Sequence, residues 1–216
     1  MSAVASPVER LVTLSGVSWE TYERLLAEHQ DQGGTRFTYN EGTLEIMVAS
    51  SRHEQPSRVL AELVGVVAEE FGINLCPLGS MTFKRSDLVK GFEPDSGYYV
   101  GRDSTFWGME VDPAVDPPPD LIIEVDVTSW SLDRFPIFAA FGVPEVWRYD
   151  GSRVAIFRLL EGRYVEVEQS QALPAVTGPL ATRFLEESRR RNRTQWLRQV
   201  REWAQARVRA SEPPLR

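Results

Sequence analysis

Two acidic residues interrupt the most apolar strand that the sequence predicts. Along residues 120–127, DLIIEVDV, side chains alternate between the two faces of a strand, so Glu124 and Asp126 share a face with Ile122. Branched apolar residues occupy both faces, which is typical of a central strand covered on both sides. Burying an ionised carboxylate is unfavourable unless the group is paired or bound to a metal. Two neighbouring carboxylates also repel each other, so this pair predicts a bound cation.

A third carboxylate precedes another predicted strand. Asp95 comes directly before residues 96–101, SGYYVG, which read as a short strand beside the acidic one. Three carboxylates, with the backbone carbonyl of Val125, offer the oxygen ligands that Mg²⁺ and Mn²⁺ prefer. The chain has one Cys and two His, which makes a zinc site a poor fit. A divalent ion held in this way activates water and offsets charge on phosphorus, the requirements of phosphodiester hydrolysis.

Each of these carboxylates also has a structural interpretation. Asp95 could simply begin a turn. Glu124 and Asp126 could pair with Arg134 or Lys84 in a buried ionic network. The residues alone leave both interpretations open.

The composition predicts a globular, cytoplasmic domain. The 216 residues are 42% hydrophobic and 25% charged, and no apolar run approaches the length of a membrane span. Residues 1–16 lack the basic segment and apolar core of a secretory signal. Cys76 is the only cysteine, which excludes an internal disulfide and favours a reducing compartment. We expect one domain over residues 15–210, between flexible ends at residues 1–14 and 211–216.

Charge is unevenly distributed along the chain. The net charge is -7, but residues 182–210 carry nine Arg and three Glu, or +6, which leaves -13 on the remainder. A basic C-terminal helix could bind nucleic acid, fold onto the acidic body of its own chain or contact a second copy. Trp196, Val200 and Trp203 form an apolar stripe on this helix, and tryptophans seldom remain in water. We therefore expect the stripe to dock on the acidic body or on another chain, as in a homodimer.

Strands and helices alternate along most of the chain. Hydrophobic periodicity and turn residues predict them. The expected helices are residues 19–29, 51–72 and 131–142 and a last helix around Trp196. The expected strands are two within residues 36–49, a region at 74–85, then 96–101, 120–127, 144–150 and a hairpin at 152–170.

This order of elements, with Glu124 on the third strand of the core, resembles the Uma-two family of endonucleases. That family belongs to the restriction-endonuclease-like superfamily of the PD-(D/E)xK type. The resemblance extends over about residues 15–205, nearly the whole chain. It is carried by residues 39–47 (YNEGTLEIM), 93–95 (EPD), 119–125 (PDLIIEV), 133–134 (DR) and 139–149 (AAFGVPEVWRY).

The resemblance implies a nuclease site and the residues that form it. In the superfamily an Asp begins the second core strand and Glu-x-Lys lies on the third, which correspond to Asp95 and Glu124. An acidic residue on the first core helix falls near Glu54. Asp126 stands where the lysine is usual, and a lysine that family members carry on the following helix corresponds to Arg134. An arginine supplies charge and a fork for phosphate but cannot accept a proton at neutral pH.

The sequence thus predicts an α/β restriction-endonuclease-like domain, a mixed sheet flanked by helices. An N-terminal helix and hairpin and a C-terminal hairpin plus helix complete it. The predicted function is hydrolysis of DNA by Mg²⁺ or Mn²⁺ held by Asp95, Glu124 and Asp126. The missing lysine keeps a second function open, a nuclease fold without catalysis that serves as a binding or assembly module.

Overall fold

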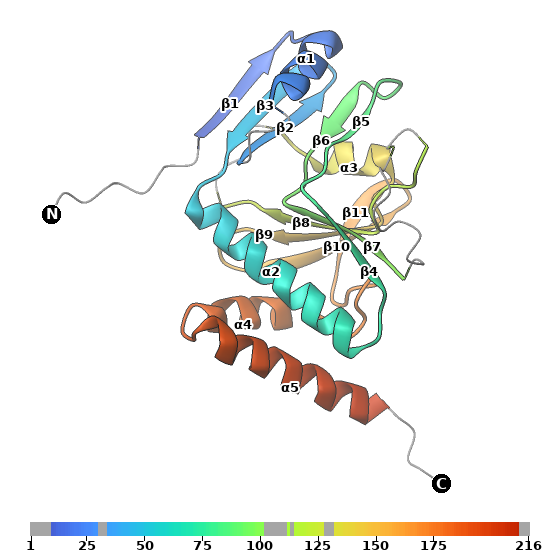
Figure 1. The fold of residues 1–216 in the computed structure, drawn as a ribbon. Helices are drawn as coiled ribbons and strands as arrows, with labels where there is room; N and C mark the ends of the chain where they lie inside the picture. The colour runs from blue at the N-terminus through green and yellow to red at the C-terminus, as the bar shows by residue number, and fades with distance from the viewer. Residues whose placement is uncertain (1–9, 30–33, 102–111, 113–114, 128–131, 212–216) are drawn as a thin grey trace, which may run out of the picture.

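The computed structural model describes residues 10–29, 34–101, 112, 115–127 and 132–211 (Figure 1). The first half holds β1 (Arg10–Ser15), α1 (Trp19–His29), β2 (Thr35–Asn40), β3 (Thr43–Val48), α2 (Ser51–Glu70), β4 (Leu75–Gly79), β5 (Phe83–Arg85), β6 (Lys90–Phe92) and β7 (Ser96–Val100). The second half holds β8 (Leu121–Val125), α3 (Phe135–Phe141), β9 (Glu145–Tyr149), β10 (Val154–Leu160), β11 (Arg163–Val167), α4 (Gly178–Ser188) and α5 (Arg193–Ser211).

The strands form two sheets. One has the order β1-β3-β2-β6-β5, and the other has the order β11-β10-β9-β8-β7-β4. In the second sheet β8 and β9 run parallel, with α3 connecting them, while β7 lies antiparallel on the other side of β8. The second sheet is therefore mixed, as predicted, and β8 is a central strand with all five residues buried.

Helices cover both faces of the six-stranded sheet. One core joins α2, α4 and α5 to the side chains of β7 to β10 that include Leu121 and Ile123. The other core joins α3 to Ile122 and Val146 and to the phenylalanines of β5 and β6. Figure 1 shows α4 and α5 beside α2, and α1 covering the five-stranded sheet. Helix α4 also meets the sheet directly, because the hydroxyl of Thr182 accepts a 2.8 Å hydrogen bond from the amide of Val154 on β10. The apolar side chains on both faces of β8 are thus covered.

The predicted second helix forms, and its start lies at the site described below. Leu60, Leu63, Val64 and Val67 recur at helical spacing, and all are buried against the sheet. The helix ends at Glu70, just before a glycine turn. This packing holds the first turn of α2 in place at the boundary between the two sheets.

Both predicted hairpins form with two-residue turns. Glu41 and Gly42 have φ of 47° and 94°, and Glu161 and Gly162 have φ of 49° and 78°. Two successive residues with positive φ match the twist of the flanking strands, which explains the glycine in each turn. The first of these hairpins, β2–β3, supplies two side chains to the site.

Three elements differ from the sequence prediction. Residues 10–14 were expected in a flexible N-terminus, yet they form most of β1, an edge strand whose side chains are mostly exposed and so give little periodicity. Strand β6 has three residues, too few for an alternation to be recognised. A single C-terminal helix was expected where the structure has α4 and α5. Residues 1–9 and 212–216 lie outside the described residues.

The start of α4 carries a signal that the sequence analysis overlooked. Thr177 is its N-cap, and its hydroxyl accepts a hydrogen bond from the amide of Leu180 at 3.3 Å. Pro179 lies in the first turn, where its missing N–H costs nothing. The sequence Thr-Gly-Pro before an apolar pattern therefore predicts this helix.

The apolar stripe of α5 docks on its own chain. Trp196 and Val200 are fully buried in the core that α2 shares with α4. The indole Nε1 of Trp196 donates a 2.7 Å hydrogen bond to the backbone oxygen of Phe184 on α4. The prediction that the stripe docks on the body of the protein is confirmed for Trp196 and Val200, while Trp203 packs against the same core and stays partly exposed.

Ion pairs with α2 accompany this docking. Arg193 pairs with Glu62 at 2.6 Å, and Arg201 pairs with Glu70 at 2.7 Å and Glu69 at 3.0 Å. These pairs are partly exposed, so they contribute little free energy and mainly fix the register of the two helices. Among the described residues, no helix is both long and apolar enough to cross a membrane.

Candidate active site

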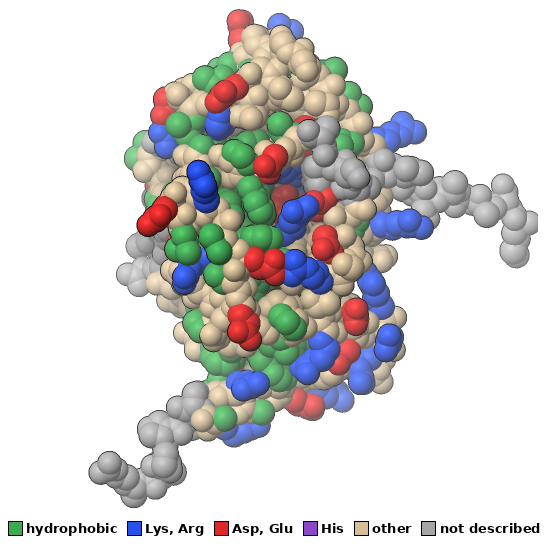
Figure 2. Space-filling view, turned by 180° about the vertical axis from the view of Figure 1, so that it is seen from behind, with side chains coloured by type: hydrophobic (Ala, Val, Ile, Leu, Met, Phe, Trp, Pro, Cys, Tyr) green, Lys and Arg blue, Asp and Glu red, His purple; other side chains and the backbone are tan. Residues whose placement is uncertain are grey.

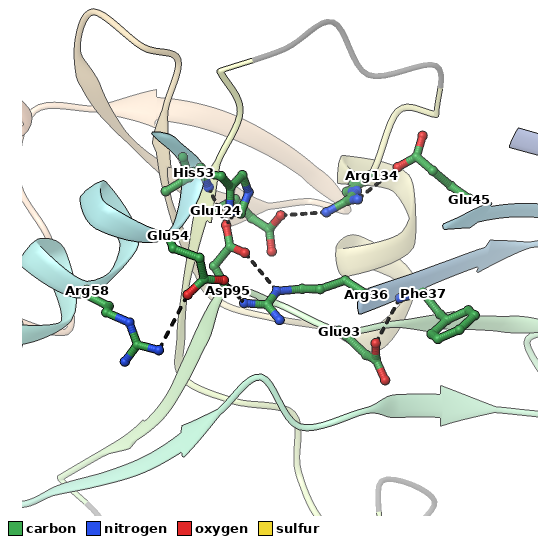
Figure 3. Close-up of polar contacts among 11 residues, drawn as sticks. Arg36, Phe37, Glu45, His53, Glu54, Arg58, Glu93, Asp95, Glu124 and Arg134 are labelled. Carbon is green, nitrogen blue, oxygen red and sulfur yellow. Dashed lines mark hydrogen bonds and ion pairs between the residues drawn. The ribbon is translucent and has the colours of Figure 1, made fainter. Parts of the chain in front are cut away.

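Asp95 and Glu124 lie side by side where β7 begins and β8 ends. The register pairs Ser96 with Ile123, so the residues one step further, Asp95 and Glu124, are neighbours. Asp95 is 6% exposed and Glu124 is 4% exposed. The Oδ2 atom of Asp95 accepts a 2.7 Å hydrogen bond from the amide of Val125, which ties the two strand ends together. The two carboxylates therefore lie together at the ends of adjacent strands, as expected from the sequence (Figure 3).

Arg36 of β2 holds the Asp95 side of the site. Its Nε donates to Oδ1 of Asp95 at 3.0 Å, and its Nη2 donates to Oε1 of Glu54 at 3.1 Å. Glu54 lies in the first turn of α2 and also pairs with Arg58 at 3.6 Å. Arg36 is only 8% exposed, so its charge is balanced here rather than by water. Glu54 therefore reaches the site through Arg36, as Figure 3 shows.

Arg134 holds the Glu124 side. It precedes α3 at the N-cap position, and its Nη1 donates to Oε2 of Glu124 at 3.0 Å. Its Nη2 donates to Oε1 of Glu45 on β3 at 2.8 Å, and Glu45 is fully buried. One guanidinium thus bridges two buried carboxylates from different sheets.

His53 completes the cluster from α2. The side chain is fully buried, and its Nε2 lies 3.2 Å from Oδ2 of Asp95. That contact lacks hydrogen-bond geometry, and neither ring nitrogen has a hydrogen-bond partner among the described residues. Its position against Asp95 restricts how that carboxylate can turn.

Burial makes Glu124 a weak acid in the absence of a cation. It raises the pKa of the Glu124 carboxyl to about 8, and the negative charge of Asp95 adds to this effect. The guanidinium groups of Arg134 and Arg36 act in the opposite direction but do not overcome burial. The Oε1 atom of Glu124 is buried and has no hydrogen-bond partner within the described residues. An ionised Glu124 therefore has one oxygen, Oε1, without a hydrogen-bond donor among the described residues.

Asp126 lies at the edge of this network. It is one residue beyond β8, and its side chain pairs with Arg148 of β9. Burial raises the pKa of Asp126, and the pairing with Arg148 opposes that rise. The backbone amide of Asp126 donates a 2.7 Å hydrogen bond to the backbone oxygen of Tyr149. Within the described residues, Asp126 thus pairs with a different arginine from those that hold Asp95 and Glu124.

Three site residues were not predicted from the sequence. These are Arg36, Glu45 and His53. The available signal for Arg36 and Glu45 was a charged residue within each strand of the β2–β3 hairpin. Strand periodicity alone cannot tell whether such a residue faces water or a partner from another sheet.

The mixed α/β fold, with acidic residues meeting at the ends of two core strands, is that of a restriction-endonuclease-like protein. The model of the family Uma2, described as "Putative restriction endonuclease", matches residues 19–187. The match covers most of the chain, so the chain belongs to the Uma2 family, and the family prediction is confirmed. No curated protein matches the chain.

Proposed function

We propose that this protein is a divalent-metal-dependent endonuclease that hydrolyses DNA phosphodiester bonds at the Asp95–Glu124 site. The observation that carries the proposal is the Oε1 atom of Glu124, which is buried beside Asp95 without a hydrogen-bond partner among the described residues, in a chain of a nuclease family. Buried carboxylate oxygens without donors are uncommon in folded proteins and call for an explanation. A cation at this point would supply one.

The carboxylate chemistry of the site fits Mg²⁺ or Mn²⁺. Asp95 and Glu124 would hold the ion, with water and substrate oxygens completing its coordination. Over the described residues, no three His, Cys, Asp or Glu side chains are grouped to hold one ion. The proposed ligand set is therefore these two carboxylates, with Asp126 left to its partner Arg148. When bound, such an ion lowers the pKa of water and polarises the phosphate.

The protein's own cations have defined tasks in this proposal. Arg36 fixes the rotamer of Asp95, and Arg134 fixes that of Glu124, so both carboxylates are oriented before substrate arrives. Both guanidinium groups also place positive charge beside the position of the phosphate. Neither can remove a proton from water at neutral pH, because a guanidinium stays protonated, so Arg134 replaces the charge of a lysine but cannot act as a general base.

The same arginines support a second candidate function, a nuclease fold without catalysis. Asp95 and Glu124 each already have a guanidinium partner, which is the arrangement of a structural ionic network. In that case the site stabilises the contact between the two sheets, and the protein acts by binding.

A nicking assay separates the two functions. Supercoiled plasmid incubated with protein and Mg²⁺ or Mn²⁺ should become open-circular, and EDTA should stop the reaction. Crystals soaked in Mn²⁺ should show an anomalous peak between Asp95 and Glu124. A peak without nicking would favour the binding module. Nicking that is undiminished by EDTA would remove the metal from the proposal.

Replacing Asp126 tests the two-carboxylate ligand set. Asp126→Asn should leave the nicking rate within a few-fold of wild type. The asparagine side chain can still accept a hydrogen bond from Arg148, and the proposed ion keeps both of its carboxylate ligands. The measurement is the initial nicking rate across a Mn²⁺ titration. A rate that falls with Asp126→Asn and recovers at high Mn²⁺ would make Asp126 a third ligand.

We also expect a homodimer, because cutting both strands of a duplex requires two single-site nucleases. A two-fold dimer would place one site on each strand. Its interface must differ from the stripe of Trp196 and Val200, which is buried within the chain. Light scattering at micromolar concentration should give about twice 24.5 kDa. A mass of one chain at both low and high salt would show a monomer that nicks strands singly.

A further inference from the structure

The turn between α4 and α5 concentrates positive charge that the fold does not neutralise. Residues 189–193 read RRRNR, and we call them the arginine turn. Arg190 and Arg191 are exposed, and among the described residues neither has an ion-pair partner. The side chain of Arg189 donates a 2.8 Å hydrogen bond to a neutral group, the hydroxyl of Tyr149. Arg193 pairs with the carboxylate of Glu62.

The arginine turn lies at the same edge of the sheet as the candidate active site. Tyr149, which Arg189 contacts, is the last residue of β9 and pairs in register with Val125 of β8. The amide of Val125 in turn bonds Asp95. The arginine turn is therefore connected to Asp95 by two hydrogen bonds and by the pairing of β8 with β9. Figure 2 shows Lys and Arg side chains gathered at the lower right, over the end of the molecule that α4 and α5 form.

We infer that the arginine turn is a binding surface for the phosphate backbone of duplex DNA that lies across the candidate active site. The inference deepens the proposed function and rests on it for the choice of DNA. Adjacent unpaired guanidinium groups repel one another, and a polyanion relieves that repulsion while releasing its own counterions. Arginine also matches the geometry of a phosphate with two parallel hydrogen bonds. A chain with a net charge of -7 otherwise repels DNA, so a local basic surface beside the site is needed to hold it.

The test is the salt dependence of DNA binding, measured by fluorescence anisotropy with a labelled duplex of about 30 base pairs, a length that spans about three helical turns. Ca²⁺ replaces Mg²⁺ so that binding is measured apart from cleavage. The test variant is Arg190→Ala/Arg191→Ala in the full chain. Loss of two phosphate contacts should make the slope of log K against log salt less negative by about 1.8. Affinity at low salt should fall at least tenfold.

Two further variants isolate the cause. Arg24→Ala/Arg163→Ala removes the same charge from exposed positions on α1 and at the β10–β11 turn, and it should leave the slope at the wild-type value. Arg190→Lys/Arg191→Lys keeps the charge and should retain most of the slope. Equal losses in the test and control variants would overturn the inference, because only net charge would then matter. A test variant that binds DNA as tightly as wild type would also overturn the inference. A test variant whose only change is a lower molecular mass in solution would overturn it too, because the arginine turn would then contact a second copy of the chain.

The same measurements separate this inference from the proposed function. Wild-type protein that binds duplex through the arginine turn but never nicks it would support the inference and remove the nuclease. Protein that nicks plasmid equally well with and without Arg190 and Arg191, with unchanged affinity, would support the nuclease and overturn the inference.

Discussion

Glu124→Gln should abolish nicking and at the same time stabilise the metal-free protein. The amide keeps the shape of the side chain but removes the negative charge that would hold the ion, so the rate should fall about 10²- to 10³-fold or more. Stability should rise because burial disfavours the ionised carboxylate that the amide replaces. A change that removes activity and adds stability is the signature of a group kept for function rather than for folding.

The sign of the stability effect follows from the pKa. An unfolded Glu124 titrates near 4.5 and the folded one near 8, so folding takes up a proton between these values. The contribution to stability is therefore fully present below pH 4.5 and is lost as the pH rises to about 8. At pH 8 the glutamine variant should exceed wild type by roughly 3 to 5 kcal/mol, at about 1.4 kcal/mol per pKa unit.

Urea unfolding in EDTA at pH 5 and pH 8 measures this difference, and Glu145→Gln is the matched control. Glu145 is also buried, but it accepts hydrogen bonds from Trp147, Ser170 and the amide of Gln171. Its amide variant should lose stability rather than gain it. Added Ca²⁺ should raise the midpoint of wild type at pH 8 and not that of Glu124→Gln. A glutamine variant less stable than wild type at pH 8 would mean that the pairing of Glu124 with Arg134 outweighs burial.

The fold was predictable from the sequence wherever an element buries a regular pattern. Helix α2 and strand β8 follow from their apolar periodicity, and both hairpins follow from a glycine after an acidic residue at the turn. Strand β1 exposes most of its side chains, and β6 has three residues, so neither carries a pattern that decides between strand and coil. These elements form because a neighbouring strand offers hydrogen bonds, which is information that lies elsewhere in the chain.

The site was half predictable for a related reason. Asp95 and Glu124 were recognisable as carboxylates in apolar strands, and the register then places them together. Arg36 and Glu45 come from the other sheet, and only the packing of the two sheets brings them within reach. Asp126 lies one residue beyond β8 and pairs with Arg148, the residue of β9 that is in register with Glu124. Long-range partners of charged residues are thus the part that sequence periodicity leaves open.

Arg134→Met should be the most destabilising single change in the site. The guanidinium bridges Glu124 and Glu45, at 3.0 Å and 2.8 Å, and all three side chains are buried. Methionine fills similar volume but removes the guanidinium, so Glu45 loses its ionic partner Arg134 while Glu124, whose pKa burial has already raised to about 8, stays protonated. Removing one partner of a buried ionic network costs about 3 to 5 kcal/mol. Urea unfolding in EDTA at pH 7 should show that loss as a lower midpoint with an unchanged slope.

Two companion variants decide whether charge or packing is responsible. Glu45→Gln/Arg134→Met also removes the charge that Arg134 balances on Glu45, so it should recover a large part of the lost stability. Simple loss of packing would make the two changes additive. Arg134→Lys restores the charge without the fork, so one ammonium must choose between Glu45 and Glu124 and stability should be intermediate. If Arg134 stands in for the lysine of related nucleases, this same lysine variant should keep nicking plasmid while Arg134→Met does not. A methionine variant that unfolds at the wild-type midpoint would show that water already screens both carboxylates and that the bridge contributes no stability.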